Sequence, residues 1–321
     1  MARTDIGGQA VIEGVMMKGR KVYAVAVRKP DGEIEVDVQD TKSILDRYKI
    51  LRLPILRGIA VFIESLTLGV KTLSYSAEVF GDEEEVEESK FEKWLMEKLG
   101  DKAEKFLIGV TMCVSFVLAI GIFMILPMLI STLFKNFIES SFILNLIEGA
   151  LRILIFLGYM KLVTCMKDIQ RTFQYHGAEH KTINCLEQEK ELTVENVRTC
   201  TRLHKSCGTS FLFVVMIVSI LVFSLFTTQN VWLRMVTRIV MVPVVAGISY
   251  EFIRWARKSG DNKFEELLSK PGMWLQKEFT TIEPDDEQIE VAIAAIKGVL
   301  DHEHVEESSP KGNCQSACCN R

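Results

Sequence analysis

The 321-residue sequence has almost no excess of charge of either sign, since 38 Lys and Arg residues face 42 Asp and Glu residues, giving a net charge of −4. This balance excludes a protein that binds nucleic acid through a purely cationic surface, so no nucleic-acid partner is expected. The glycine-rich start, IGGQAVIEGVMMKGR, lacks the Lys-Ser/Thr ending of a phosphate-binding P-loop. The same polar start lacks the apolar core of a secretory signal.

Apolar residues, in contrast, are abundant: 48% of the chain is hydrophobic and 25% is charged. Such a content of Leu, Ile, Val and Phe excludes a disordered chain, which could not keep these residues solvated. A charged fraction typical of soluble proteins, beside so large an apolar fraction, indicates that the two classes are segregated along the chain. The length allows about two domains.

Four apolar segments predict membrane-spanning helices, because each reaches about the 20 residues that cross the hydrocarbon layer. They are residues 106–134, 142–166, 206–233 and 235–253. The second contains Glu148 and Arg152, which lie four residues apart and are expected to pair inside the bundle. The predicted fold class is therefore an α-helical integral membrane protein with about four transmembrane helices.

Positive charge sets the predicted orientation. Lys and Arg residues concentrate between the second and third spans and after the fourth. The positive-inside rule therefore places both of these segments, and both termini, in the cytoplasm. The expected location is the cell membrane, with several passes through the lipid bilayer.

The N-terminal part predicts two further elements. Residues 21–28 and 33–38 form a β-hairpin pattern across a Pro-Asp-Gly turn. A long apolar segment, residues 54–73, carries three charges spaced every seven residues along one helical stripe: Arg57, Glu64 and Lys71. This stripe favours an interfacial or re-entrant helix, or a helix packed on the bundle, over a fifth span.

The chain therefore divides into seven predicted regions. They are a glycine-rich and β-hairpin cytoplasmic region (1–50), an interfacial or re-entrant helix (51–80), an acidic linker with an amphipathic helix (81–105), transmembrane helices one and two (106–166), a cytoplasmic loop (167–205), transmembrane helices three and four (206–253), and a cytoplasmic C-terminal region with a short amphipathic helix at 289–300 and a disordered tail (254–321).

The strongest chemical motif is YHGAEHK in the central cytoplasmic loop. On a helix, His176 and His180 project from one face and Glu179 lies beside them. This is the H-x-x-E-H order of the inverted zinc peptidases, in which two His residues hold zinc and the Glu activates water. Gly177 weakens a helix by about 1 kcal/mol relative to Ala, so a local turn is the alternative backbone.

Other candidate ligands converge on the same membrane face. His204 and Cys207 precede the third span, and Glu251 lies where the fourth span ends. A closed set of His176, His180, His204 and Cys207 would form a structural tetrahedral site for a divalent ion, zinc being favoured by imidazole ligands. An open set of three ligands, with Glu179 as general base, would suit catalysis. Alternatively, these His residues are ordinary interfacial residues among many Lys and Arg.

The remaining cysteines predict little chemistry. Cys185 and Cys200 lie in the central loop and could assist a metal, but their spacing matches no standard zinc motif. The C-terminal cysteines are expected to be reduced thiols in a flexible cytoplasmic tail. They are Cys314, Cys318 and Cys319.

Four motifs in order resemble the YqhQ-type bacterial membrane proteins. They are GGQAVIEGVMMKG, FQYHGAEHKTINCLE, RLHKSCGTSFLF and PGMWLQKEFTTIEPDDEQIEVAI, within residues 5–300. That family carries a domain of unknown function and is described as predicted metal-dependent enzymes, so the resemblance implies a multi-spanning cell-membrane protein with a metal site. The family usually has Pro after the His of the third motif, whereas Lys205 stands there in this sequence.

Three functions are open at this point. The first is a membrane-embedded metal-dependent hydrolase, with a peptidase as one form, in which His176, His180 and His204 hold a divalent ion and Glu179 is the general base. The second is a non-enzymatic membrane factor with a structural metal site, contacting another membrane protein or a ribosomal component. The third, a transporter, is disfavoured because four spans show no inverted repeat, although a homo-oligomer could supply more helices.

Overall fold

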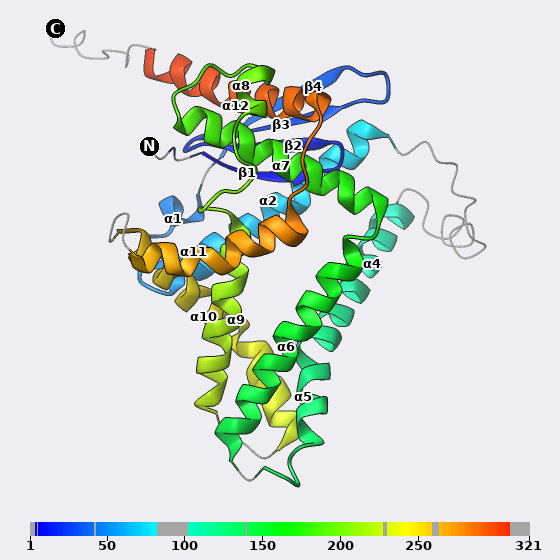
Figure 1. Ribbon diagram of the computed structural model, residues 1–321, viewed down its shortest axis with the longest axis vertical. Coiled ribbons are helices and arrows are strands. Elements are labelled where there is room, and N and C mark those ends of the chain that lie inside the picture. The colour runs from blue at the N-terminus through cyan, green and yellow to red at the C-terminus, as the bar shows by residue number, and fades with distance from the viewer. Residues whose placement is uncertain are drawn as a thin grey trace, which may run out of the picture.

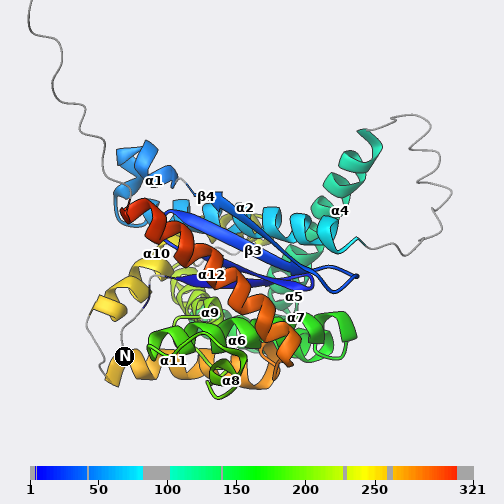
Figure 2. The ribbon, with the colours of Figure 1, turned by 90° about the horizontal axis from the view of Figure 1, so that it is seen from above.

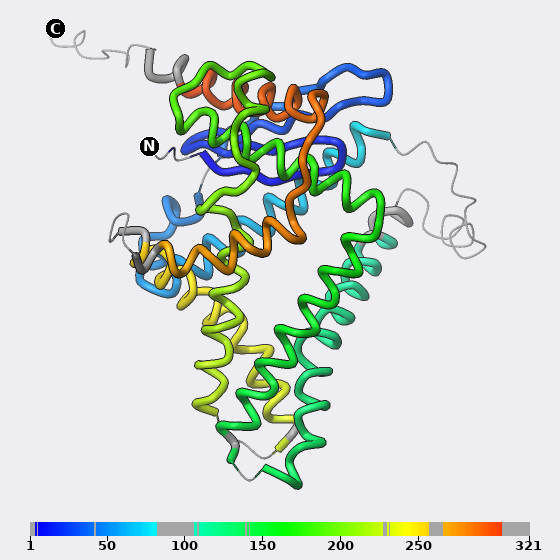
Figure 3. The backbone as a smooth tube through the Cα atoms, in the orientation of Figure 1, coloured from blue at the N-terminus to red at the C-terminus, as the bar shows by residue number. Residues whose placement is uncertain are grey.

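The structure, a computed structural model, describes residues 4, 6–41, 43–81, 102–138, 140–226, 230–258 and 263–308, which are coloured in Figure 3 except at a few helix ends. A helical bundle forms one end of the molecule and a small β-sheet covered by helices forms the other (Figure 1). The predicted acidic linker beyond Gly81 and the three C-terminal cysteines lie outside the described residues.

The sheet has four antiparallel strands in the order β1-β2-β3-β4. The strands are β1 (Gly7–Val11), β2 (Gly14–Lys18), β3 (Val22–Arg28) and β4 (Ile34–Asp40). The predicted hairpin corresponds to β3 and β4, whereas β1 and β2 were not predicted, because the glycine spacing of this segment indicated bends or a close backbone approach rather than strands. Gly14 serves a strand here: a Cβ at this position would lie 2.3 Å from the Ala26 carbonyl oxygen on β3.

Helices cover both faces of the sheet, which explains why nearly every residue of β2 and β3 is buried (Figure 2). On one face, Val15, Met17 and Ala24 pack against the helices α7 (Lys167–Glu187) and α12 (Asp286–Ser308), with the short helix α8 (Val194–Arg198) beside them. On the other face, Met16 and Val25 pack against α2 (Leu56–Phe80). Alternate residues of each strand thus serve two separate cores.

Helix α2 joins the sheet to the bundle. It follows two short helices, α1 (Ile44–Arg47) and the 3₁₀ turn η1 (Lys49–Arg52). Near its start, Gly58 packs on Gly247 of α10 (Val231–Lys258), where a Cβ would come within 2.9 Å of the Gly247 Cα. Its three striped charges each have a separate partner: Arg57 pairs with Glu251, Glu64 accepts from Ser43, and Lys71 donates to Tyr23. The helix therefore packs on the bundle, one of the predicted placements, and also on the sheet.

The bundle is built from the apolar helices. They are α4 (Lys102–Ile120), the π-helical turn η2 (Gly121–Ile125), α5 (Leu126–Thr132), α6 (Ser141–Val163), α9 (Gly208–Ser224) and α10 (Val231–Lys258). Within the described residues, three stretches are long and apolar enough to cross a membrane: Gly109–Thr132, Phe142–Val163 and Trp232–Ala256. Their surfaces carry large apolar side chains such as Phe116, which is 67% exposed, as expected for contact with lipid.

The predicted span 206–233 is not one helix. Helix α9 has 17 residues and ends at Ser224, and α10 begins at Val231. The Asn230 side chain accepts hydrogen bonds from the backbone N–H groups of Trp232 (2.9 Å) and Leu233 (3.2 Å), so this polar residue caps the start of α10. The uncharged segment 206–233 therefore contains the end of one helix and the start of the next. The number of membrane crossings stays a prediction.

The predicted Glu148–Arg152 pair is present, with 3.2 Å between the charged atoms. Two further arginines, Arg234 (2.9 Å) and Arg238, pair with the same carboxylate, which is 2% exposed. Arg152 also donates to the Phe123 carbonyl (3.1 Å) in the π-helical turn η2, where the regular backbone hydrogen bonds are disturbed. We call Glu148, Arg152, Arg234 and Arg238 the arginine cluster.

Candidate functional site

Helix α7 carries the histidine motif without interruption, so the alternative of a local turn at Gly177 is wrong. Gly177 has a different purpose. A Cβ at this position would lie 2.1 Å from the Ile282 carbonyl oxygen, in the segment that crosses α7 on the way to α12. The glycine allows this backbone to lie directly on the helix, at a cost in helix propensity of about 1 kcal/mol.

The two histidines of α7 point their Nε2 atoms toward the same space. The Nδ1–H of His176 donates to the Thr280 carbonyl (2.7 Å), and the Nδ1–H of His180 donates to the Arg202 carbonyl (2.8 Å). Because a carbonyl can only accept, both neutral rings carry their lone pair on Nε2. The two ring centroids are 4.3 Å apart. Burial holds the pKa of His180 well below its usual range, which favours the neutral, ligand-competent form.

Cys207 completes the group from a distant part of the chain. It is the N-cap residue of α9, and its Sγ lies 3.3 Å from the Nε2 of His176. One ligand atom from each of His176, His180 and Cys207 lies within 4.8 Å of the others. We call these three residues the histidine–cysteine cluster. Burial raises the pKa of the Cys207 thiol, so without a cation the group stays a protonated thiol.

Glu179 lies at the edge of this cluster. Its carboxylate is 3.8 Å from the Nε2 of His176, and its side chain is 5% exposed. Burial raises the pKa of Glu179 to about 8, although the neighbouring His176 acts in the opposite direction. Strand β1 covers it closely, because a Cβ on Gly8 would fall 2.6 Å from the Glu179 Cγ. The Glu179 Oε2 atom is buried without a hydrogen-bond partner among the described residues.

The donor set suits a divalent transition metal. Two imidazole nitrogens and a thiolate are the ligands that zinc prefers, and each His has its other nitrogen bonded to a backbone carbonyl, as metal-binding His residues usually do. The orphaned Glu179 oxygen is a second sign of a missing partner, since a buried polar atom left unbonded costs about 1–3 kcal/mol.

A second π-helical turn holds two parts of the site in place. Helix α11 (Lys263–Leu275) continues into η3 (Gln276–Thr280), whose last carbonyl is the acceptor for His176. The fully buried Gln276 donates to the His204 carbonyl (2.9 Å) and accepts from the His204 N–H (2.9 Å). This side chain therefore fixes the backbone that leads into Cys207. π-Helical turns are frequent at functional sites.

The turn between β1 and β2 also reaches α7. Glu13 in this turn has a φ of 47°, a left-handed conformation that is uncommon for a residue with a side chain. Its carboxylate accepts hydrogen bonds from Arg171 (2.6 Å at one nitrogen) and from the Tyr175 hydroxyl (3.1 Å). Glu13 therefore anchors the helix at Tyr175, one residue before His176.

Two of the predicted ligands lie elsewhere. The His204 ring is 5.8 Å from the His180 ring, but its Nε2 faces the Glu187 carboxylate at 3.4 Å. Glu251 forms an ion pair with Arg57. Neither residue belongs to the group of three that the structure brings together.

The two loop cysteines are also remote from that group. Cys185 and Cys200 are buried in the core between the sheet and its helices, so they do not assist the candidate ligands.

Comparison with known proteins identifies the family of this chain. The model of a family described as "Protein of unknown function (DUF1385)" matches residues 53–302. The chain belongs to this family. It is also 38% identical over 306 residues to the "Uncharacterized protein YqhQ" of Bacillus subtilis (strain 168), covering 95% of each chain. No solved structure matches. These matches confirm the resemblance to the YqhQ-type proteins. Neither the family nor the relative has a described activity.

Sequence reasoning missed the residues that support the cluster. Gln276, Thr280 and Arg202 act through a side-chain amide or backbone carbonyls, and such roles leave no mark in residue type or spacing. The glycines did give a signal. Gly8 allows strand β1 to lie close to Glu179 of α7, and Gly177 allows the backbone at Ile282 to lie directly on α7. A glycine in a sequence can indicate such a close approach as well as a bend.

Proposed function

We propose that this chain is a metal-dependent hydrolase of the cell membrane, with its site at the cytoplasmic face of the bundle. His176, His180 and Cys207 would hold a divalent ion, zinc by the preference of its ligands. The observation that carries the proposal is the number of ligands. Ligand atoms of three residues converge, while His204, a fourth predicted ligand, faces the Glu187 carboxylate instead. Catalytic zinc sites commonly have three protein ligands and one open position.

Each residue has a defined task in this proposal. A bound divalent ion would supply Lewis-acid activation of water and of a carbonyl or phosphoryl oxygen. Glu179 would accept the proton of the attacking water at its buried Oε2 and pass it to the leaving group. A nearby cation would stabilise its carboxylate and bring its pKa down from about 8 into the range of a base at neutral pH. Strand β1, lying over Glu179 at Gly8, would exclude bulk water.

The proposed topology is four crossings with both termini in the cytoplasm. Its support is that the sheet, α7 and α12 share one hydrophobic core, which must lie on one side of the membrane. The chain leaves that core through α4–α6 and again through α9–α10, so each excursion needs an even number of crossings. Helix α9 would cross with 17 residues, about 26 Å, in a hydrocarbon layer of about 30 Å. Local thinning of the bilayer accommodates such a shortfall.

Metal analysis of the purified full-length chain tests the site. We expect about one divalent ion per chain in the wild type, loss of that ion in His176→Ala and Cys207→Ser, and retention in Glu179→Gln. His204→Gln and Glu251→Gln are the matched controls and should keep the ion. Loss of the ion in His204→Gln would identify a closed, structural site and overturn the proposed hydrolase.

A complementation assay tests catalysis separately from metal binding. Glu179→Gln preserves size and metal ligands but removes the base, so it should fail to restore function in cells that lack the chain. Loss of a general base typically costs about 10²–10⁴-fold in rate. Full function of Glu179→Gln with the ion still bound would instead support a non-enzymatic membrane factor held together by a structural metal.

A further inference from the structure

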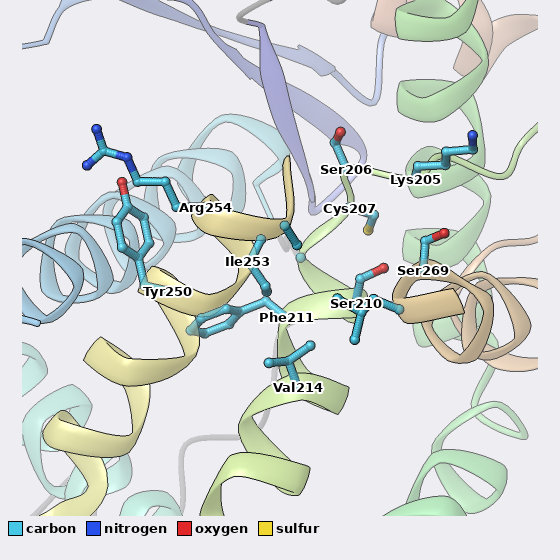
Figure 4. Close-up of a pocket in the computed structure, with 13 residues that line it drawn as sticks. Lys205, Ser206, Cys207, Ser210, Phe211, Val214, Tyr250, Ile253, Arg254 and Ser269 are labelled. Atoms are coloured by element: carbon cyan, nitrogen blue, oxygen red, sulfur yellow. The ribbon is translucent and has the colours of Figure 1, made fainter. Parts of the chain in front are cut away.

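A pocket of about 580 Å³ opens beside the histidine–cysteine cluster and shares Cys207 with it. Figure 4 shows that the pocket lies where α9 begins, between α10 on one side and α11 on the other. Helix α11 is held there by close packing, since a Cβ on Gly272 would meet the Ser210 Oγ at 2.1 Å. The pocket therefore lies at the level where the apolar bundle meets the sheet-containing part.

The two ends of this pocket differ in chemistry. Toward the bundle its wall is apolar, formed by Phe211, Val214 and Ile253. Toward the sheet, Figure 4 places Lys205 and Arg254 on opposite sides of Cys207. None of the residues that line the pocket is acidic, although the Glu251 carboxylate lies near Arg254 outside the lining.

Hydroxyl groups line the zone between these ends. Ser210, Tyr250 and Ser269 all border the pocket. The Ser210 Oγ is buried and has no hydrogen-bond partner among the described residues. The first turn of α9, which begins at Gly208, adds backbone N–H groups and the positive end of a helix dipole.

These features suit one kind of ligand. The first turn of α9 and the nearby hydroxyls can recognise a phosphate, with Lys205 on one side and Arg254 on the other adding positive charge, and apolar walls continuous with two bundle helices accept an acyl chain that arrives from the bilayer. We propose that the pocket binds an anionic phospholipid, with its phosphate at the start of α9 between the charges of Lys205 and Arg254 and its acyl chains along Phe211 and Val214. This inference rests on the hydrolase proposed above, because it names the substrate class of that site.

The position of Cys207 connects binding with chemistry. A lipid held in this way brings an ester bond next to the histidine–cysteine cluster. Hydrolysis would add the oxygen of water to the acyl carbon or phosphorus of that ester and break its bond to the alcohol oxygen. The proton of the water would pass through Glu179 to the departing alcohol oxygen, so that an acid and an alcohol leave the site.

A titration of the full-length chain in an uncharged detergent tests the binding. The probes are dihexanoyl phosphatidylglycerol, dihexanoyl phosphatidylcholine and glycerol phosphate, which separate charge from acyl chains. We expect the anionic lipid to bind at least about tenfold more tightly than either other probe, because only this lipid carries both a net negative charge and acyl chains. Equal binding of both lipids, or binding of glycerol phosphate as tight as that of phosphatidylglycerol, would overturn the proposal.

Variants identify the pocket as the binding site. Lys205→Gln with Arg254→Gln should weaken phosphatidylglycerol binding by about tenfold or more, while leaving phosphatidylcholine binding and the metal content unchanged. The matched control, Lys190→Gln with Arg198→Gln, removes the same two residue types from exposed positions outside the pocket and should bind as the wild type does. An unchanged lipid preference in the pocket variant would refute the assignment.

The two proposals can fail separately. Selective lipid binding by a chain that holds no metal would refute the hydrolase and leave the lipid pocket standing. A chain with one metal ion and an essential Glu179, but no preference for the anionic lipid, would refute the lipid pocket and leave the hydrolase.

Discussion

The two polar clusters in this molecule differ in whether their charged and polar groups pair with one another. In the arginine cluster, one carboxylate pairs with three guanidinium groups, and Arg152 also donates to Ser219 (2.9 Å). In the histidine–cysteine cluster, three ligand atoms face one another with no cation among them, and the Glu179 Oε2 lacks a partner among the described residues. The first cluster pairs a carboxylate with cations of the same chain and ties helices together. The second gathers groups of the kind that bind a cation.

The largest effect should come from removing the carboxylate of the arginine cluster. Glu148→Gln leaves three buried guanidinium groups without their counter-charge, which should cost about 3–5 kcal/mol of stability. Thermal unfolding in detergent measures this, with Glu266→Gln as control, since its pair with Lys270 is exposed and contributes at most about 1 kcal/mol. A loss of stability below about 1 kcal/mol in Glu148→Gln would contradict the view that this carboxylate holds the arginine cluster together.

The next effect tests how tightly the second cluster is built. Gly177→Ala places a methyl group against the Ile282 carbonyl, and we expect a loss of about 1–3 kcal/mol and impaired metal binding, because α7 must shift. Gly158→Ala on α6 is the matched control, since its Cβ would meet nothing within 4 Å. Equal stability and metal content of the two variants would show that the crossing segment does not position the histidines.

The pH dependence of the metal-free chain should separate the clusters further. The pKa of Glu179 is about 8 in the folded chain, against 4.5 for an exposed Glu. Between these values the folded state binds more protons than the unfolded state, so this group lowers the free energy of unfolding as pH rises, by up to about 1.4 kcal/mol per pH unit. With a chelator present, the wild type should lose more thermal stability between about pH 5 and pH 8 than Glu179→Gln does. Parallel pH profiles of the two proteins would contradict this assignment.

The smallest effect should belong to His204. His204→Gln removes the contact with Glu187 but leaves the backbone hydrogen bonds to Gln276, so it should cost about 1 kcal/mol or less. Calorimetry or thermal unfolding of the variant measures the loss. A cost of several kcal/mol would indicate that the ring takes part in the histidine–cysteine cluster, and the contrast with the arginine cluster would weaken.

The sequence predicted those parts of the molecule that depend on local spacing. The histidine motif, the Glu148–Arg152 pair and three long apolar helices are all one-helix patterns, and each is present in the structure. The hairpin of β3 and β4 has its own turn residues and was also predicted. In these cases the residues that determine the element lie within a few turns of one another.

What was missed depends on contacts between distant segments. Strands β1 and β2 are buried because α2 and α12 cover the sheet, and neither helix can be inferred from the glycine-rich sequence of the strands. The sequence predicted that the candidate ligands lie on one face of the bundle. It did not predict which of them come together in the group of three. Whether His204 or Cys207 faces His176 depends on Gln276, about seventy residues later, which fixes the backbone between them.

The shared core of β2, β3 and α12 has a consequence for how the protein is made. The strands leave the ribosome well before α12, which begins at Asp286, about 260 residues after the end of β3. At about 5–20 residues per second, the sheet must wait on the order of tens of seconds for its covering helix. During that interval the apolar face of Val15, Met17 and Ala24 is exposed while the intervening apolar helices are made. Translation speed and chaperone capture should therefore decide how much of the newly made protein becomes functional.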